Sequence, residues 1–311
     1  MQVLVTGADG FVGRHLCGHL REQGDSVAEA YGPDPQSRGQ ETSAVDVTDP
    51  VGLRAAVQTA RPDAIIHLAG FSSVAKSHAD PSQTFAVNTL GAVHLLAAAR
   101  DVAPKARILL IGSAECYGAL AAGVRATEEL PLRPLSPYAA SKVAAEVAGF
   151  QFHRATSLAV IGVRPFNHIG AGQAPHFVVP SFARQVDAIR RRRAPGVLKV
   201  GDLSVVRDFS HVDDVAQAYR LLVLRGEPGQ VYNVCSGEGR TIRSLLDEML
   251  ELAGVSAGIE VDRERLRAAE IPSLIGDPGK LRKLGWQPSR TVRDALREAL
   301  DEAAAAAEQP G

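Results

Sequence analysis

A tyrosine and a lysine one helical turn apart are the sharpest chemical signal in the sequence. Tyr138 and Lys142 stand four residues apart, a spacing that puts both side chains on one face of a helix. A ketone that accepts hydride needs a proton on its oxygen, and a phenol can supply it. Because a free phenol has a pKa of about 10, bringing it to neutral pH needs roughly 4 kcal/mol, which one nearby ammonium could provide. The pair predicts proton transfer at a carbon–oxygen bond.

Two further side chains could take part in this chemistry. Ser113 follows a predicted strand at residues 107–111, and α/β sheets bind their ligands at the carboxyl ends of the strands. Its hydroxyl could donate to the substrate oxygen beside Tyr138. Glu115 lies two residues further on. Its carboxylate could abstract a proton next to a keto group, orient the substrate, or have a structural role, and all three alternatives stay open.

A glycine-rich turn near the N-terminus could hold a dinucleotide. Gly7, Gly10 and Gly13 come directly after an apolar strand and open a helix. Glycines let the backbone approach a pyrophosphate, and the N–H groups at a helix N-terminus bind its charge. We predict that these glycines, with Phe11 and Val12 between them, bind NAD(P)H.

The preference for NAD or NADP is ambiguous at the residue that would set it. An acidic side chain at the end of the second strand would bind the ribose 2′-OH and favour NAD. That place falls near Tyr31, with Glu29 two residues earlier. Since neither a clear acid nor an arginine occupies it, the sequence leaves the preference open.

The elements that must position these side chains follow from the apolar pattern. Short apolar runs alternate with helical patterns through the first half of the chain, which is typical of a parallel sheet covered on both faces. We therefore predict the doubly wound α/β (Rossmann) fold. The expected strands lie at residues 3–6, 26–30, 43–47, 64–68, 107–111 and 159–163, and the expected helices at 53–60, 89–100 and 138–154.

The pattern changes after Arg164, where we predict a smaller C-terminal substrate-binding lobe. Loops are expected at residues 167–173 and 201–208, helices at 179–193 and 212–224, and a strand at 231–234. The predicted dinucleotide-binding domain covers residues 1–166 together with 210–235. The predicted nucleotide-sugar-binding lobe covers residues 167–209 and 236–311.

Composition limits the remaining classes of function. A formal net charge of −1 gives no bulk electrostatic attraction to nucleic acid, and we interpret the run at residues 190–193 as a solvated helix end. The three cysteines are odd in number and far apart, which favours a reducing cytoplasm. We expect no metal site, because no ligand spacing is visible. We also expect no secretion signal and no membrane span.

These motifs resemble the extended short-chain dehydrogenase/reductases, the NAD-dependent epimerase/dehydratase family. The glycine spacing is GxxGxxG rather than the GxGxxG of common dehydrogenases. The resemblance covers nearly the whole chain and is closest to the reductases of GDP-linked 4-keto-6-deoxy sugars. The segments that carry it are 112–118, 136–142, 164–170, 177–185, 199–203, 206–209, 231–237 and 271–277.

The resemblance implies an NAD(P)H-dependent reduction of the C4 keto group of a nucleotide-linked 4-keto-6-deoxyhexose. The expected reaction converts GDP-4-keto-6-deoxy-D-mannose to GDP-D-rhamnose. The alternatives are a nucleotide-sugar 4,6-dehydratase of the GDP-mannose type, a 4-epimerase and, more distantly, a non-catalytic dinucleotide-binding regulator. Ala171 stands where proline is usual and Ala114 where a second serine is common, so fine substrate preference stays open.

The resemblance also implies residue roles beyond the catalytic group. Four of the residues named below also have a structural alternative to a binding role. Asp46 and Asn88 could cap helices, Arg207 could form a surface salt bridge, and Glu270 could be a solvated side chain. Since the helices at 89–100 and 138–154 are rich in alanine and related enzymes pair through them, we expect a homodimer. The implied cofactor-binding residues are Asp46, Val47, Leu68, Ala69 and Asn88, and the implied substrate-binding residues are Asn167, Val178, Arg207 and Glu270.

Overall fold

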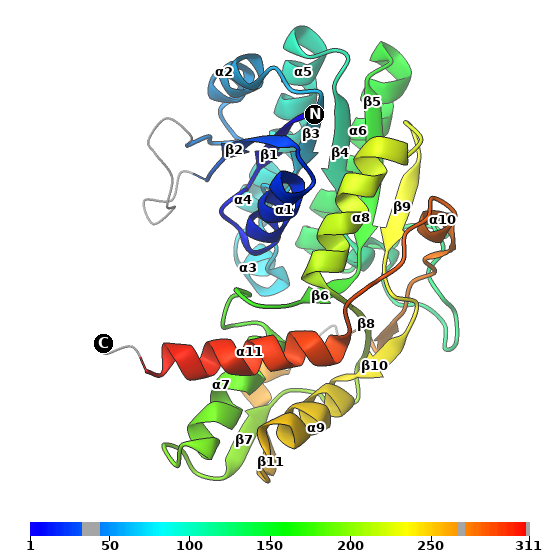
Figure 1. The fold of residues 1–311 in the computed structure, drawn as a ribbon. Coiled ribbons are helices and arrows are strands. Elements are labelled where there is room, and N and C mark those ends of the chain that lie inside the picture. The colour runs from blue at the N-terminus through cyan, green and yellow to red at the C-terminus, as the bar shows by residue number, and fades with distance from the viewer. Residues whose placement is uncertain (33–43, 267–270, 309–311) are drawn as a thin grey trace.

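Six parallel strands form the central sheet of the computed structural model, which describes residues 1–32, 44–266 and 271–308 (Figure 1). Their order is β2-β1-β3-β4-β5-β9, and every neighbouring pair runs in parallel. The predicted doubly wound fold is therefore confirmed. The strands are β1 (Gln2–Thr6), β2 (Ser26–Ala30), β3 (Ala64–His67), β4 (Arg107–Ile111), β5 (Ala159–Pro165) and β9 (Val231–Val234).

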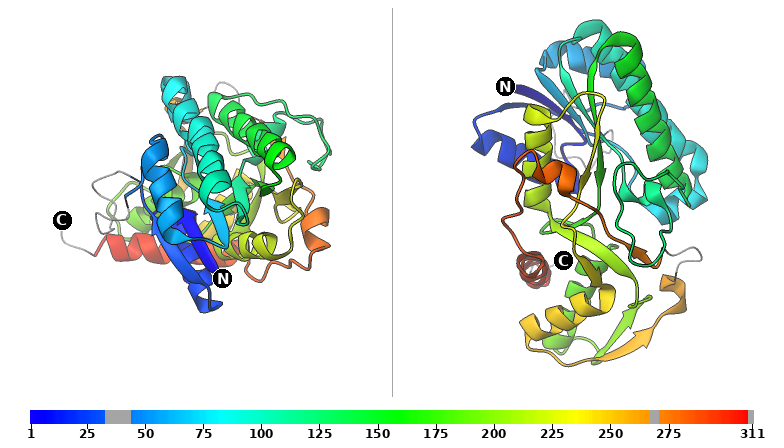
Figure 2. Two further views of the ribbon diagram at one scale, coloured as in Figure 1. Left: turned by 90° about the horizontal axis from the view of Figure 1, so that it is seen from above. Right: turned by 90° about the vertical axis from the view of Figure 1, so that its right-hand side faces the viewer.

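Helices cover both faces of this sheet, as Figure 2 shows with the sheet seen between its two helical layers. Successive side chains of a strand point to opposite faces, so Val3 and Val5 enter the core with α1 and α8, whereas Leu4 enters the core with α2, α5 and α6. One layer contains α1 (Phe11–Glu22) and α8 (Val212–Arg225), and the other contains α2 (Pro50–Ala60), α5 (Gly91–Val102) and α6 (Pro137–Thr156).

A smaller lobe lies beyond the carboxyl ends of the strands (Figure 1). It has its own apolar core, which includes Phe182, Leu246 and Leu296. Its strands are β6 (Asn167–Ile169), β7 (Val197–Val200), β8 (Val206–His211), β10 (Gly239–Thr241), β11 (Gly258–Val261) and β12 (Ser273–Leu274), and its helices are α7 (Val178–Arg190), α9 (Ile242–Ala253) and α11 (Val292–Ala306). Short helices α3 (Val74–Ala79), α4 (Pro81–Phe85) and α10 (Gly279–Arg282) complete the fold.

One predicted strand is wrong. Of the described part of residues 43–47, only Ala44 pairs, through a single bridge to Tyr31. Asp46 Oδ1 accepts hydrogen bonds from the backbone N–H of Thr48 at 2.8 Å and from its hydroxyl at 2.7 Å. This side chain closes a turn immediately before α2, so the backbone leaves the extended path that a strand requires.

Two predicted loops contain strands. β6 occupies the start of the loop expected at 167–173, and β8 begins inside the loop expected at 201–208. The two strands pair with each other, and β8 also pairs with β10 and β12. Their composition is polar, so their stability depends on partners distant in sequence rather than on local apolar alternation.

Candidate active site

The glycine turn between β1 and α1 is shaped so that only glycine fits at two positions. Gly7 has a φ of +69°, a conformation that side chains with a β-carbon rarely adopt. A β-carbon on Gly13 would lie 2.6 Å from the carbonyl oxygen of Ala8. Helix α1 begins at Phe11 without a side-chain cap on Gly10, so its N-terminal end is suited to a pyrophosphate. These residues fit the dinucleotide predicted for them.

Replacing Gly13 with alanine should weaken binding of NADPH and NADH by at least about tenfold, because overpacking here forces the turn apart. Gly18→Ala provides the matched control: it lies on the same helix, and a β-carbon there would meet no atom within 4 Å. Fluorescence titration of the reduced nicotinamide measures both dissociation constants. Equal binding by the two variants would contradict the assignment of this turn.

Helix α6 carries the predicted catalytic pair. Its N-cap is Ser136, whose hydroxyl accepts from the backbone N–H of Ala139 at 3.1 Å, and proline follows at the first helical position. Tyr138 therefore lies in the first turn and Lys142 in the next. Ser113 approaches from the end of β4, where it caps a short 3₁₀ turn by accepting from the N–H of Glu115 at 3.2 Å.

A single cleft of about 310 Å³ brings these groups together with the glycine turn. It opens at the carboxyl ends of the central strands, between the sheet and the smaller lobe. Among the predicted site residues, it is lined by Gly7, Gly10, Phe11, Val12, Gly13, Leu68, Ser113, Tyr138, Lys142 and Asn167. The described wall also contains residues that the sequence analysis did not select, notably His168, Gln173, Phe177 and Tyr219.

The phenol of Tyr138 is held in its protonated form. Burial raises its pKa to about 12, a hydrogen bond with Ser113 opposes this rise, and the charges of Glu115 and Cys116 add to it. Burial also lowers the pKa of Lys142 to about 8, and its ammonium donates to the carbonyl oxygen of Ile111 at 3.0 Å. A protonated phenol is the form that a proton donor to a ketone requires. The sequence argument expects Lys142 to lower the pKa of Tyr138, whereas in the structure burial raises it. Stabilisation of the phenolate by Lys142 during the reaction stays a prediction.

Asn88 hydrogen-bonds both α6 and the loop after β3. It lies in a π-helical turn, Ala86–Leu90, directly before α5. Its Nδ2 donates to Ser141 Oγ at 2.9 Å, and its Oδ1 accepts from the N–H of Phe71 at 2.8 Å. A β-carbon on Gly70 would lie 2.8 Å from this Oδ1 and 3.3 Å from Lys142 Nζ. Asn88 thus connects the cleft wall to α6, next to Lys142, although it does not itself line the cleft.

Other predicted residues lie outside the described lining of the cleft. Asp46 accepts from Thr48, as above, and Val47 packs over Gly91 at the start of α5. Ala69 donates its N–H to Thr6 Oγ1 at 3.3 Å. Val178 is the first residue of α7, one position after the cleft residue Phe177.

The structure describes two of the three charged residues that were predicted to bind substrate. Arg207 is 6% exposed rather than superficial, and its Nη1 donates to the carbonyl oxygen of Ile271 at 2.6 Å. Glu115 is half-buried at the edge of the site, close enough for its charge to act on Tyr138. Glu270 lies outside the described residues.

The end of the second strand stays ambiguous in the structure. The hydroxyl of Tyr31 donates to the carboxylate of Glu29, which also pairs with Arg21. This carboxylate is therefore already satisfied by a phenol and a guanidinium. Among the residues described at this strand end, none presents a free acid to a ribose hydroxyl or an arginine to a 2′-phosphate, and the preference for NAD or NADP stays open.

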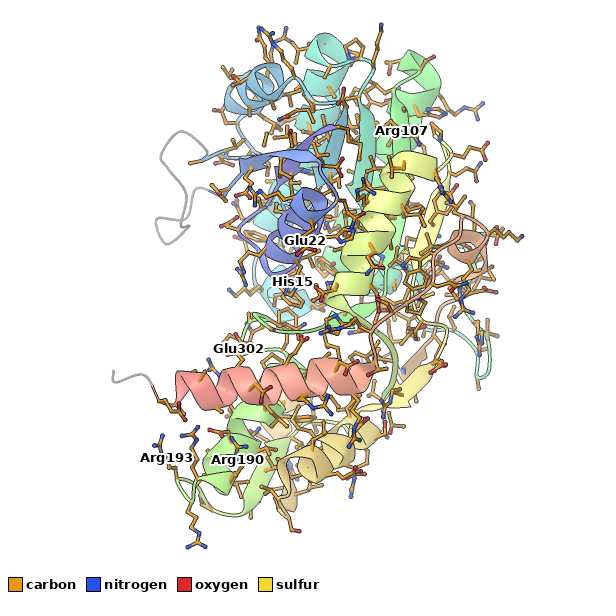
Figure 3. All side chains as sticks on the ribbon, viewed as in Figure 1. His15, Glu22, Arg107, Arg190, Arg193 and Glu302 are labelled. Atoms are coloured by element: carbon orange, nitrogen blue, oxygen red, sulfur yellow. The ribbon has the colours of Figure 1, made fainter. Side chains whose placement is uncertain are left out.

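Hydrogen bonds from α1 and α11 hold the loop after β6, at Ala171 and Gly172, beside the cleft. His15 bonds to Asp213 Oδ1 at 2.7 Å through Nδ1 and to the carbonyl oxygen of Ala171 at 2.9 Å through Nε2. The N–H of Gly172 donates to Glu302 Oε2 at 2.8 Å. His15 on α1 and Glu302 on α11 are labelled in Figure 3, the first on a helix of the central sheet and the second on a helix of the smaller lobe. The hydrogen bond to Asp213 raises the pKa of His15.

The fold and this site define an NAD(P)-dependent enzyme of the extended short-chain dehydrogenase/reductase type. Residues 4–299 match the family model of GDP-mannose 4,6 dehydratase, and the chain belongs to this family. The resemblance stated from the sequence is thereby confirmed. No described helix has the length and apolar character needed to cross a membrane.

Three known proteins illustrate the similarity. GDP-6-deoxy-D-mannose reductase of Pseudomonas aeruginosa is 38% identical over 303 residues, which cover 97% of this chain and 96% of the relative. The structure of RMD from Pseudomonas aeruginosa complexed with NADPH matches with a TM-score of 0.87 and 36% identity, over 98% of this chain and 100% of the other. The UDP-glucose 4-epimerase of Thermus thermophilus in complex with NAD matches equally, with a TM-score of 0.87, 32% identity and the same coverage.

Proposed function

We propose that this protein uses NAD(P)H to reduce the C4 keto group of GDP-4-keto-6-deoxy-D-mannose, giving GDP-D-rhamnose. The observation that carries the proposal is that Ser113 and Tyr138, whose hydroxyls are close enough for Ser113 to influence the pKa of Tyr138, line the same cleft as the glycine turn. Similarity to the GDP-6-deoxy-D-mannose reductase of Pseudomonas aeruginosa supports the choice of sugar.

In this proposal the chain positions and protonates the ketone. The two hydroxyls of Ser113 and Tyr138 hold the carbonyl oxygen, and both strengthen their hydrogen bonds as negative charge develops on it. Tyr138 then gives up its proton to that oxygen. Lys142 binds the ribose next to the ring, and Glu115 orients the sugar. The bound cofactor supplies the hydride.

Substrate binding falls to the second lobe. We propose that Asn167, at the cleft, hydrogen-bonds the sugar or diphosphate and that Arg207 pairs with the diphosphate, since its guanidinium matches phosphate oxygens. Val178 and Glu270 complete the proposed set. The proposed dinucleotide-binding domain is residues 1–166 with 210–235, and the proposed nucleotide-sugar lobe is residues 167–209 and 236–311.

A 4,6-dehydratase is the second candidate, because the matching family model is that of a dehydratase. That reaction requires a base for the proton at C5, and Glu115 is the carboxylate nearest in sequence to Ser113. A dehydratase, like a 4-epimerase, regenerates its cofactor in each cycle. A reductase consumes it.

The deciding experiment offers purified protein GDP-4-keto-6-deoxymannose with NADPH or NADH. We expect loss of the absorbance of the reduced nicotinamide, one equivalent per sugar reduced, and NMR of the product then reports the configuration at C4. A second assay offers the same protein GDP-mannose, and its conversion to a 4-keto sugar without net consumption of cofactor would instead establish the dehydratase.

We also propose that two copies pair through α5 and α6, which lie side by side on the outer face (Figure 2). Val147 on α6 and Leu90 directly before α5 are exposed, although both are apolar, and a two-fold axis would bury each against its copy. Sedimentation at micromolar concentration should give twice the chain mass of 32.9 kDa. Val147→Arg should give the single-chain mass, and a monomeric wild type would refute the pairing.

We place the enzyme in the cytoplasm. Its three cysteines, Cys17, Cys116 and Cys235, are all free and buried. Burial raises the pKa of the Cys17 and Cys116 thiols to about 12, so they are unreactive and behave as packing residues. Free thiols of this kind suit a reducing compartment.

A further inference from the structure

Tyr219 on α8 reaches the cleft with a hydroxyl that the protein leaves unpaired. The residue is 1% exposed, yet it lines the cleft. Among the described residues, three polar side-chain atoms are inaccessible to solvent and have no hydrogen-bond partner: His67 Nε2, Gln173 Oε1 and Ser210 Oγ. The Tyr219 hydroxyl also has no hydrogen-bond partner among the described residues, but it is not one of these inaccessible atoms. The hydroxyl therefore opens onto the cleft.

The two other buried tyrosines have hydrogen-bond partners within the protein, which the Tyr219 hydroxyl lacks among the described residues. The hydroxyl of Tyr117 donates to Asn233 Oδ1 at 2.6 Å, and that of Tyr232 accepts from the N–H of Glu227 at 3.0 Å. Water in the cleft can hydrogen-bond the Tyr219 hydroxyl, and a ligand that displaces this water must replace its hydrogen bond or leave the hydroxyl without a partner. The hydroxyl of Tyr219 thus has the features of a ligand contact.

The location of Tyr219 indicates which ligand. It packs in the core between α1, α8 and the sheet, whereas Tyr138 and Lys142 come from α6 on the opposite face. The charge of an ionised Tyr138 would raise the pKa of Tyr219, so the two phenols are within electrostatic reach. Both residues line the same cleft, so a nicotinamide that lies against Tyr138 would be within reach of Tyr219.

We propose that the Tyr219 hydroxyl hydrogen-bonds the carboxamide of the nicotinamide and so sets the rotation of the ring against Tyr138. This inference rests on the proposed function. The ribose hydroxyls are assigned to the α6 face, where Lys142 lies, which leaves the carboxamide as the polar group facing α8. Burial raises the pKa of Tyr219, so its hydroxyl remains neutral and can donate to the amide oxygen.

The test is a comparison of two ligands with Tyr219→Phe in the full chain. Dissociation constants for NADPH and NADH should rise about five- to tenfold, the loss expected for one hydrogen bond. ADP-ribose, which lacks the nicotinamide, should bind as it does to the wild type. Tyr232→Phe is the matched control, since it removes a buried hydroxyl from the same core, and should leave all three dissociation constants unchanged.

Three outcomes would overturn the inference. Unchanged binding of NADPH and NADH to Tyr219→Phe would remove the contact, and an equal loss for ADP-ribose would show a general distortion of the site. A wild type that binds neither dinucleotide would overturn the proposed function itself, and the inference with it. Thermal unfolding of each variant confirms that the folded protein is being compared.

Discussion

Tyr138→Phe is expected to lower kcat about 10²–10⁴-fold while the fold survives. Phenylalanine keeps the ring on the first turn of α6 but removes the proton that the product alcohol needs. The hydroxyl of Tyr138 interacts with Ser113, whose Oγ also accepts from the N–H of Glu115 at 3.2 Å, so the substitution leaves Ser113 with a hydrogen-bond partner. NADPH should still bind, because the glycine turn is untouched.

Single-turnover consumption of NADPH measures this effect separately from cofactor release. Because the pKa of Tyr138 is about 12, the phenol remains protonated at and well above neutral pH. The wild-type rate should therefore show no loss from tyrosine ionisation in the neutral range. Near-normal turnover by Tyr138→Phe, with Tyr232→Phe as the control for a lost hydroxyl, would remove Tyr138 from the mechanism.

The parts of the site that the sequence predicts well are those built from neighbouring residues. The glycine turn joins one strand to the next helix, so the spacing of its three glycines in the sequence is enough to predict its shape. Tyr138 and Lys142 share one helix, and a spacing of four residues is enough to place them together. In both cases the structure brings these residues into one cleft with Ser113.

The smaller lobe was harder to predict because its strands are stabilised at long range. The carboxylate of Asp208 illustrates this. Its Oδ1 accepts from Ser236 and its Oδ2 from the N–H of Gly237 at 2.9 Å and of Gly276 at 3.2 Å. These partners lie 28 to 68 residues away, and no local pattern reveals them. The sequence consequently predicts a loop over residues 206–208, the first half of β8.

Tyr219 was missed for a different physical reason. It occupies an apolar position of an amphipathic helix, among Val215, Ala216 and Leu222 of the same core, and this pattern predicts a packing residue. Only the three-dimensional structure shows that its hydroxyl passes beyond the core to the cleft. Periodicity reports which side of a helix is buried and gives no information on what the tip of a long side chain meets.

The second large effect is expected at the ion pair that locks α6 against β5. Arg164 donates to Glu146 twice, from Nε at 2.9 Å and from Nη2 at 2.6 Å, and the two side chains are only 5% and 7% exposed. Its Nη1 also donates to the hydroxyl of Tyr117 at 2.9 Å. Glu146 lies one turn after Lys142, and Arg164 directly precedes the cleft residues Pro165–Asn167. The pair therefore connects the catalytic helix with the opposite wall of the site.

Glu146→Gln should lower the free energy of unfolding by about 3–5 kcal/mol, because it leaves a buried guanidinium without its counter-charge. The pair itself contributes much less, since burying two charges costs nearly what their attraction returns. Glu146→Leu combined with Arg164→Met should accordingly recover most of that loss, and urea unfolding of Glu146→Leu, Arg164→Met and the double variant measures the coupling. If the loss in the double variant equals the sum of the losses from Glu146→Leu and Arg164→Met, the two side chains act independently, and the contact between α6 and β5 is not an ion pair in energetic terms.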